Sequence, residues 1–300
     1  MNKDKKKIGL ALSGGGYRAA AYHVGTLRAL HKLGILNKVD VISSVSGGSI
    51  TTAYYALHKD DYQTFEQGLI ARLQRGVLWS SFLYVGVLGV LVLAFAVVLG
   101  YITALVMGTL WPNHPIWAGS VAALVGVCAL VLALLGILKN SFTALPTSKL
   151  ISKLYDKVFF ERKTLSDLPQ TPLICINSTN LATQLPFTFS RGMMGEYAYR
   201  INGQSMFDAN GFPLSRAVMA SSCVPYGFTP ITIGAAFVRG KYEDCEQKPE
   251  PPKLIDGGVY DNQGAHKLSQ DKSRFRCDYI VVSDAGNGNV SAAGTTHFFN

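Results

Sequence analysis

IGLALSGGGYR, residues 8–18, joins a short apolar run to three glycines and an arginine. Ile8–Leu12 predicts a buried strand, Ser13–Gly16 a turn, and Tyr17–Leu33 a helix with apolar residues at helical spacing. A strand that ends in a turn and leads into a helix is the unit from which parallel sheets are built. The stretch therefore predicts an α/β protein.

The same order of elements follows at once. Val39–Val45 is rich in β-branched residues and predicts a second strand, Ser46-Gly47-Gly48 a turn, and Ser49 onward to Leu73 a helical run. Two such units imply right-handed crossovers, with functional groups where strands end and helices begin. Further along, we expect an amphipathic stretch at Leu150–Phe160, a short helix at Ser215–Ser221, strands at Leu173–Asn177, Phe187–Phe189 and Leu254–Asp256, and a last buried strand at Tyr279–Ser283.

One long segment interrupts this pattern. From Val77 to Leu138 the chain has no Asp, Glu, Lys or Arg. The segment holds two apolar runs, Phe82–Leu110 and Ile116–Leu138, each long enough to cross a hydrocarbon core about 30 Å thick. Prolines and a tryptophan separate them at Trp111–Pro115, which predicts a transmembrane helical hairpin. A buried helical pair in a soluble core is the alternative, disfavoured because such helices carry a charged face.

The hairpin divides the chain. We expect one domain made of residues 1–76 and 139–300, with residues 77–138 inserted as the hairpin. Basic residues lie on both flanks, and the short loop between the helices has none, so the positive-inside rule places both flanks in the cytoplasm, at the inner membrane of a bacterium. These flanking residues are Arg72, Arg75, Lys139, Lys149 and Lys153. The start of the chain is also basic and would face anionic headgroups or remain solvated; its lysines are Lys3, Lys5, Lys6 and Lys7.

Composition supports contact with lipid. Hydrophobic residues make up 48% of the 300 residues and charged residues 16%. The net charge is +9, and several of the basic residues flank the hairpin. This placement indicates membrane orientation, so we expect no nucleic acid partner. No cleavable signal peptide is visible, and the five cysteines show no metal-ligand spacing, which favours reduced thiols in a cytoplasmic domain.

The first motif with chemical meaning is Ser44-Val-Ser46-Gly-Gly48. It sits between a strand and a helix, where a nucleophile elbow holds an exposed serine on a sharp turn. Small residues around Ser46 allow backbone segments to approach, although Ser44 replaces the usual first glycine. Alone, the motif also fits an ordinary turn or helix cap.

The second motif is Gly14-Gly-Gly16-Tyr-Arg18. Consecutive glycines let backbone N–H groups converge on one point, which makes an oxyanion hole or another anion site. The pattern Gly14-x-Gly16-x-x-Ala19 also fits a dinucleotide fingerprint, but that fingerprint requires an acidic residue at the end of the second strand, where this chain has Ser46. Arg18 is interpreted as steadying the loop or a lipid phosphate, or as a plain surface residue.

The third motif is Asp256-Gly-Gly258 at a strand end. An aspartate there can take a proton from a serine, although Asp-Gly-Gly is also a common turn. A nucleophile, an oxyanion site and a base would then all lie at strand ends of one sheet.

In this order, the three motifs resemble the patatin-like phospholipase family. Further matches are Gly25-x-Leu27, Leu173–Asn180 and Ala220–Pro225 leading to Phe228 and Pro230. The resemblance implies a three-layer α/β sandwich with a central, mostly parallel sheet. It also implies a Ser-Asp dyad without a catalytic histidine, metal or cofactor, acting on lipid acyl esters.

Carried onto this chain, the resemblance implies that Ser46 attacks, Asp256 is its base, and Gly14, Gly15 and Gly16, with Arg18 beside them, hold the oxyanion. We expect an acyl-enzyme mechanism on (lyso)phospholipids, with the bilayer as partner. A catalytically silent membrane protein of this fold and a nucleotide-binding membrane protein are the alternatives. Lipid class, positional choice, oligomeric state and any further C-terminal element remain open. Met193 and Met194 are interpreted as a surface loop or an apolar lip for acyl chains.

Overall fold

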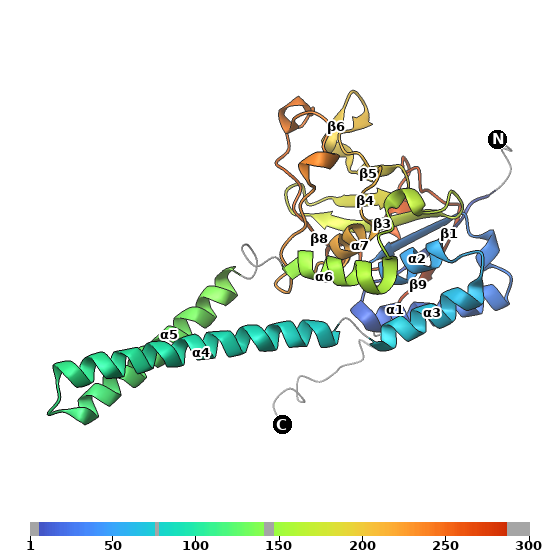
Figure 1. The fold of residues 1–300 in the computed structure, drawn as a ribbon. Helices are drawn as coiled ribbons and strands as arrows, with labels where there is room; N and C mark the ends of the chain where they lie inside the picture. The colour runs from blue at the N-terminus through green and yellow to red at the C-terminus, as the bar shows by residue number, and fades with distance from the viewer. Residues whose placement is uncertain (1–5, 76–77, 141–146, 287–300) are drawn as a thin grey trace, which may run out of the picture. The chain divides into compact units, whose positions relative to one another are not determined.

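The computed structural model describes residues 6–75, 78–140 and 147–286, and within them seven strands form one mixed sheet. Six strands lie in the order β5-β4-β3-β2-β1-β9, and β8 pairs with β3 off that path (Figure 1). The strands are β1 (Ile8–Leu12), β2 (Val41–Val45), β3 (Leu173–Asn180), β4 (Pro186–Ser190), β5 (Met193–Gly195), β8 (Leu254–Asp256) and β9 (Tyr279–Ser283), and a separate ribbon pairs β6 (Arg200–Ile201) with β7 (Gln204–Ser205).

The sheet was predicted to be mostly parallel, and it is mixed. Strands β9, β1, β2 and β3 run in one direction, whereas β4, β5 and β8 are antiparallel to their neighbours. The strand direction changes after β3, which continues to Asn180 and then turns back directly into β4. In this turn the Asn180 N–H donates to the Leu185 carbonyl. A connection this short can join only antiparallel strands.

Helices cover both faces of the sheet. Side chains alternate along each strand, so Ser44 and its neighbours on one face meet α2, where the Ser49 hydroxyl donates to the Ser44 hydroxyl. On the opposite face, Leu268 of α9 packs with Ala11 and Cys175. The helices of this α/β unit are α1 (Gly16–Lys32), α2 (Gly47–Leu57), α3 (Tyr62–Arg75), α6 (Thr147–Tyr155), α7 (Leu214–Ser221), α8 (Gly258–Asp261) and α9 (His266–Ser269). Single turns of helix lie at η1 (Leu36–Lys38), η2 (Asp156–Phe160), η3 (Leu165–Asp167), η4 (Tyr197–Tyr199), η5 (Ala235–Phe237) and η6 (Tyr242–Asp244).

Three local predictions were wrong. The run from Ser49 to Leu73 is two helices, because Asp61 accepts a hydrogen bond from the Thr64 N–H and begins α3 as a cap. Strand β9 is at the sheet edge, and Tyr279 is 54% exposed, so the last strand is not buried. Met193 and Met194 form edge strand β5 instead of a loop, and Met194 is fully buried.

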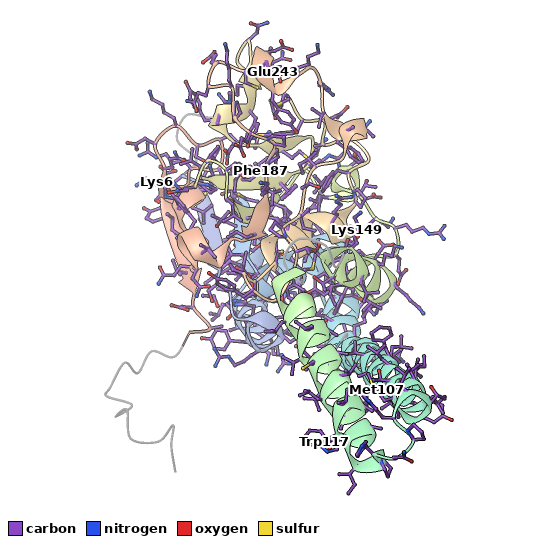
Figure 2. The ribbon with its side chains drawn as sticks, turned by 90° about the vertical axis from the view of Figure 1, so that its left-hand side faces the viewer. Lys6, Met107, Trp117, Lys149, Phe187 and Glu243 are labelled. Carbon is purple, nitrogen blue, oxygen red and sulfur yellow. The ribbon has the colours of Figure 1, made fainter. Side chains whose placement is uncertain are left out.

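The uncharged segment forms a helical pair. Helices α4 (Leu78–Leu110) and α5 (Pro115–Asn140) both contain 22-residue spans, Gly89–Leu110 and Pro115–Gly136, that are long and apolar enough to cross a membrane by length and composition. Only 6% and 11% of their most apolar windows are buried, unlike helices of a soluble core. Figure 2 shows Met107 and Trp117 projecting outward from this pair, while Phe187 lies among the strands.

Small residues hold the two helices close. A Cβ placed on Gly100 would lie 3.4 Å from the Ala122 carbonyl oxygen, and one on Gly126 would lie 3.4 Å from the Ala96 carbonyl oxygen. Close backbone approach at small residues is how helices associate within lipid, where a hydrophobic driving force is absent.

The chain thus forms two compact units. The α/β unit combines residues on both sides of the helical pair, and the helical unit contains Gly76–Thr147 with Tyr226–Thr229. Of the residues expected to face lipid headgroups, Lys3 and Lys5 lie outside the described ranges. Arg72 is engaged within the α/β unit: its guanidinium donates to the Val158 carbonyl and pairs with Glu161.

Candidate active site

Two strands meet end to end along one edge of β3. The last residue of β2, Val45, pairs with Asn177, and the last residue of β8, Asp256, pairs with Ser178, the next residue of β3. Because β2 runs parallel to β3 and β8 antiparallel to it, their carboxyl ends point toward each other. The topology therefore brings Ser46 and Asp256 together from positions far apart in the sequence.

Ser46 has a strained backbone. Its φ of 50° and ψ of −123° lie in a region that residues with a Cβ rarely adopt, at the junction of β2 and α2. Its N–H donates to the Ser221 carbonyl at 3.1 Å and to the Ser221 hydroxyl at 3.0 Å, and these bonds help hold the turn. A strained serine between a strand and a helix is the geometry of a nucleophile elbow.

The glycines after Ser46 allow close packing of three backbone segments. A Cβ on Gly47 would lie 1.9 Å from the Gly16 carbonyl oxygen, and one on Gly48 would lie 2.5 Å from the Leu12 carbonyl oxygen. Ser44, where a glycine was expected, is accommodated within β2, and its hydroxyl accepts a hydrogen bond from Ser49. The elbow is thus intact despite this substitution.

Asp256 is held as a buried carboxyl beside Ser46. It is 7% exposed, and one carboxylate oxygen accepts the Gly258 N–H at 2.7 Å. Burial raises the pKa of Asp256 above its ordinary value, and hydrogen bonds from Ser46 and Gly258 oppose that rise. A carboxylate with a raised pKa beside a serine side chain is suited to take the proton of its hydroxyl.

The glycine loop adjoins Ser46. A Cβ on Gly14 would lie 3.3 Å from the Ser46 Cβ, and the Gly14 N–H donates to the Asn262 carbonyl at 2.9 Å. The predicted oxyanion donor at Gly14 is therefore engaged in this conformation. Gly15 and Gly16 are exposed, and no acceptor for either N–H is found in the described part of the chain.

Arg18 lies on the first turn of α1 and is exposed. Its terminal nitrogen is 3.9 Å from the Cβ position of Gly15, so it borders the loop. No described residue forms an ion pair with Arg18. The guanidinium is thus available to an anion beside the loop.

Sequence reasoning assigned no role to three residues around the dyad. The Ser221 hydroxyl donates to the Asn177 carbonyl at 2.6 Å and contacts the Ser49 hydroxyl. The Asn177 amide donates to the Ser43 hydroxyl and the Ser44 carbonyl, which ties β3 to β2 just before the nucleophile. Asn262 fixes Gly14. The segment Ala220–Pro225 was noted as a family match, but only the fold reveals these contacts.

His23 contacts the backbone directly before the glycine loop. It is fully buried, and its Nε2 lies 2.9 Å from the carbonyl oxygen of Ser13, directly before the glycine loop. Its Nδ1 contacts the Ser283 hydroxyl at 3.0 Å. Burial lowers the pKa of His23, which keeps the ring neutral, so it can donate to Ser13 while accepting from Ser283.

Cys223 is the nearest rival nucleophile, since its carbonyl accepts the Asp256 N–H. Burial and the charge of Asp256 raise the pKa of its thiol to about 12, so the reactive thiolate is scarce. Within the described ranges, no group of three or more His, Cys, Asp or Glu side chains is placed to hold a metal ion.

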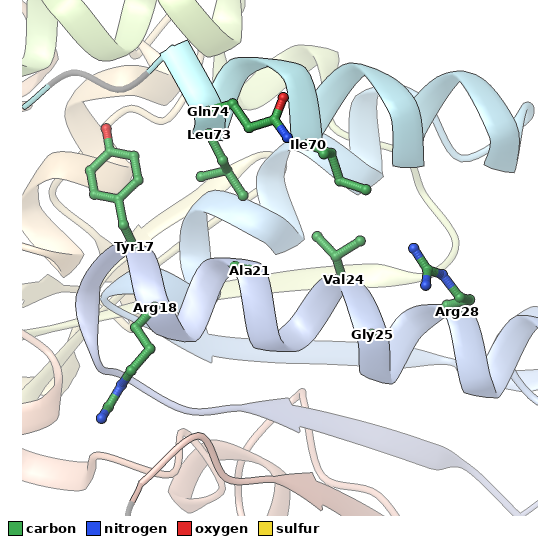
Figure 3. Close-up of a pocket in the computed structure, with 9 residues that line it drawn as sticks. All are labelled: Tyr17, Arg18, Ala21, Val24, Gly25, Arg28, Ile70, Leu73 and Gln74. Carbon is green, nitrogen blue, oxygen red and sulfur yellow. The ribbon is translucent and has the colours of Figure 1, made fainter.

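An apolar groove of about 560 Å³ starts next to the glycine loop, between α1 and α3 (Figure 3). Val24 of α1 points toward Ile70 and Leu73 of α3 across it, while Arg18 points away. Tyr17, which directly follows Gly16, lines one end. The lining of the groove is mostly apolar, which suits an apolar ligand such as an acyl chain.

The comparisons place this site in context. The family model described as patatin-like phospholipase matches residues 10–268. VipD from Legionella pneumophila resembles the chain with 18% identity and a TM-score of 0.38, covering 86% of this chain and 46% of its own. Human GIVD cytosolic phospholipase A2 has 14% identity and a TM-score of 0.49, covering 93% and 43%. The chain thus spans less than half of these two proteins. No curated protein sequence matches it significantly.

Proposed function

Because the chain belongs to the patatin-like phospholipase family, we propose that it is a membrane-anchored lipid acyl hydrolase with Ser46 as nucleophile and Asp256 as base. The observation that carries this proposal is the strained Ser46 at a strand-to-helix turn, beside a buried Asp256 whose pKa the Ser46 side chain affects. Family membership supports lipid hydrolysis, and this geometry supports the specific dyad.

In the proposed reaction, Asp256 takes the hydroxyl proton as the Ser46 Oγ bonds to the ester carbonyl carbon. The carbonyl oxygen becomes an oxyanion, held by N–H groups of Gly15 and Gly16 and by the N-terminus of α2. Collapse breaks the bond to the leaving alcohol, which receives the proton from Asp256. Water then attacks the acyl carbon while Asp256 takes its proton, the bond from that carbon to the Ser46 Oγ breaks, and Ser46 recovers the proton as the fatty acid leaves.

Of the three glycines that the sequence suggested as oxyanion donors, we keep two, Gly15 and Gly16. Gly14 has a structural partner in Asn262, so we give it the role of shaping the loop. We propose that Gly15 and Gly16 point their N–H groups at the substrate, and that Arg18 pairs with a lipid phosphate near the loop. Each lost donor would cost roughly 10²–10³ in kcat.

We propose a phospholipid or lysophospholipid ester as substrate. The groove between α1 and α3 would take the acyl chain, since it begins at Tyr17, one residue after the glycine loop. Apolar side chains also flank the dyad along the chain: Val224 is 49% exposed and Val259 is 56% exposed. Exposed apolar residues beside a buried dyad suit a substrate presented by a lipid surface.

We propose that residues 77–138 anchor the enzyme as a transmembrane hairpin inserted within one hydrolase domain, residues 1–76 and 139–300. Two long apolar helices with exposed surfaces support this, together with exposed Trp111 and Trp117 near the turn. With basic residues on both flanks, the hydrolase domain would lie in the cytoplasm. Anchoring confines enzyme and substrate to one surface and raises their effective concentration.

Acyl release tests the proposal. Wild-type protein in vesicles of mixed phospholipids should liberate fatty acid, and Ser46→Ala should not. Ser221→Ala serves as a control for a neighbouring hydroxyl that supports the elbow but does not attack, and it should retain part of the activity. Equal release by wild type and Ser46→Ala, or none from either, would refute the assignment and favour a catalytically silent protein of this fold.

A further inference from the structure

A second hollow in the α/β unit is lined by several charged side chains. It has a volume of about 520 Å³ and lies between β5, the β6–β7 ribbon and the segment that follows α9. Neither Ser46 nor Asp256 lines it. Its charged lining residues are Glu196, Arg200, Lys267, Lys272 and Arg274. We call it the basic cavity.

The basic cavity has four cationic lining residues, two arginines and two lysines. Within the described ranges, none of the four forms an ion pair with a carboxylate. Arg200 instead lies over the Tyr197 ring at 5.5 Å, and Arg274 over the Phe275 ring at 5.8 Å. Four unneutralised positive charges around one concave space create a strong attraction for an anion.

Lys267 is the innermost of these cations by burial, since it is half-buried while the other three are exposed. Burial lowers the pKa of Lys267, and the charge of Glu196 opposes that effect. A partly buried ammonium without a salt bridge carries a desolvation cost that a bound anion would offset.

Glu196 is the single carboxyl of the lining and neutralises little of this charge. It is 7% exposed, its Oε1 accepts hydrogen bonds from Thr183 and Asn180, and its Oε2 has no partner. Burial raises the pKa of Glu196. With one carboxyl against four cations, the lining of the cavity keeps an excess of positive charge.

We propose that the basic cavity binds a phosphate group, carried either by a lipid headgroup or by a soluble compound. Two arginines can each make paired hydrogen bonds to phosphate oxygens, and two lysines add mobile point charges. Phe275 and Met193 provide an apolar wall for the rest of the ligand. The basic cavity is separate from the site proposed for hydrolysis, because neither Ser46 nor Asp256 lines it.

Calorimetric titration of the full chain in a neutral detergent tests the proposal with two probes. Inorganic phosphate is one, and detergent micelles doped with phosphatidic acid are the other, against micelles doped with phosphatidylcholine. The test variant is Lys272→Gln with Arg274→Gln, and both side chains are exposed, so their replacement leaves the buried core intact. The control is Lys248→Gln with Lys253→Gln, which removes the same charge from exposed positions outside the cavity.

We expect wild type and the control to bind, and the test variant to bind about tenfold or more weakly, because it loses two charge-assisted hydrogen bonds. Lys267→Arg, which keeps the charge, should bind as tightly as wild type, whereas Lys267→Gln should bind more weakly. Binding of inorganic phosphate identifies a soluble ligand, and binding of phosphatidic acid alone identifies a headgroup. Absence of binding in wild type, or equal weakening in test and control variants, would overturn the proposal.

Discussion

Ser46 and Asp256 stand at the facing ends of β2 and β8, where burial raises the pKa of the Asp256 carboxyl and the nearby Ser46 side chain opposes that rise. Neither strand contacts the other along its length. Both are positioned by consecutive residues of β3, so the register of β3 sets the distance between nucleophile and base. The predictions below follow from this arrangement.

Asp256→Asn should abolish hydrolysis and raise stability. The amide cannot accept the Ser46 proton, so activity should fall on the order of 10³-fold or more. The pKa of Asp256 is raised in the folded state, so folding is favoured by protonation, and stability falls as pH rises from the ordinary value of 3.8 through the raised one. At neutral pH the charged group therefore costs stability, which the neutral amide avoids while still accepting the Gly258 N–H.

Thermal unfolding and acyl release, measured on the same preparation, check this pair of effects. A lower midpoint temperature for Asp256→Asn would show that the carboxylate stabilises the fold, contrary to the account.

The acid side of the pH profile should report Asp256. Since its carboxyl must be ionised to act as base, kcat/KM should fall as pH decreases through its pKa. Burial raises that pKa, so the fall should be centred above the ordinary value of 3.8. The profile is measured on a soluble short-chain ester, and a midpoint at or below that ordinary value would contradict the assignment.

His23→Ala should impair catalysis without removing a catalytic group. His23 positions the glycine loop through the Ser13 carbonyl, and its loss should misplace the oxyanion donors, with kcat reduced roughly tenfold or more and KM little changed. The control is His31→Ala, whose exposed ring stacks on Tyr62 far along α1 from the loop. A change in KM alone, or equal losses in both variants, would argue against a positioning role.

Ala21→Trp should alter chain-length preference. Ala21 is an exposed residue of the groove between α1 and α3, so an indole there would occupy space proposed for the acyl chain. Long-chain esters should lose kcat/KM relative to short-chain esters. Ala29→Trp, at another exposed position of α1 outside the groove, should leave the ratio unchanged. Equal ratios in wild type and Ala21→Trp would place the acyl chain elsewhere.

Much of the fold was predictable because the relevant signals are local. Strands Ile8–Leu12, Leu254–Asp256 and Tyr279–Ser283 were predicted at their observed bounds, since short apolar runs bounded by turns are distinctive. The antiparallel half of the sheet was not, because pairing between β3, β4 and β8 depends on how strands return in space. The break between α2 and α3 was missed because the capping role of Asp61 was not weighed against the helical period.

The residues of the candidate site likewise include some that local sequence signals predict and others that only the fold reveals. Ser46 and Asp256 were selected by their positions at predicted strand ends, and their proximity then follows from β3. The contacts of Asn262 with Gly14 and of His23 with Ser13 join segments distant in sequence, and nothing in their local motifs indicates them. The His23 side chain points back along α1 to the loop, and the spacing of the two in the sequence does not indicate this contact.

Labelling with a fluorophosphonate, followed by peptide mapping, identifies the nucleophile. We expect one adduct per chain on Ser46, no adduct in Ser46→Ala, and much slower labelling of Asp256→Asn because the hydroxyl lacks its base. An adduct on another residue, or undiminished labelling of Ser46→Ala, would contradict the claim that Ser46 is the nucleophile.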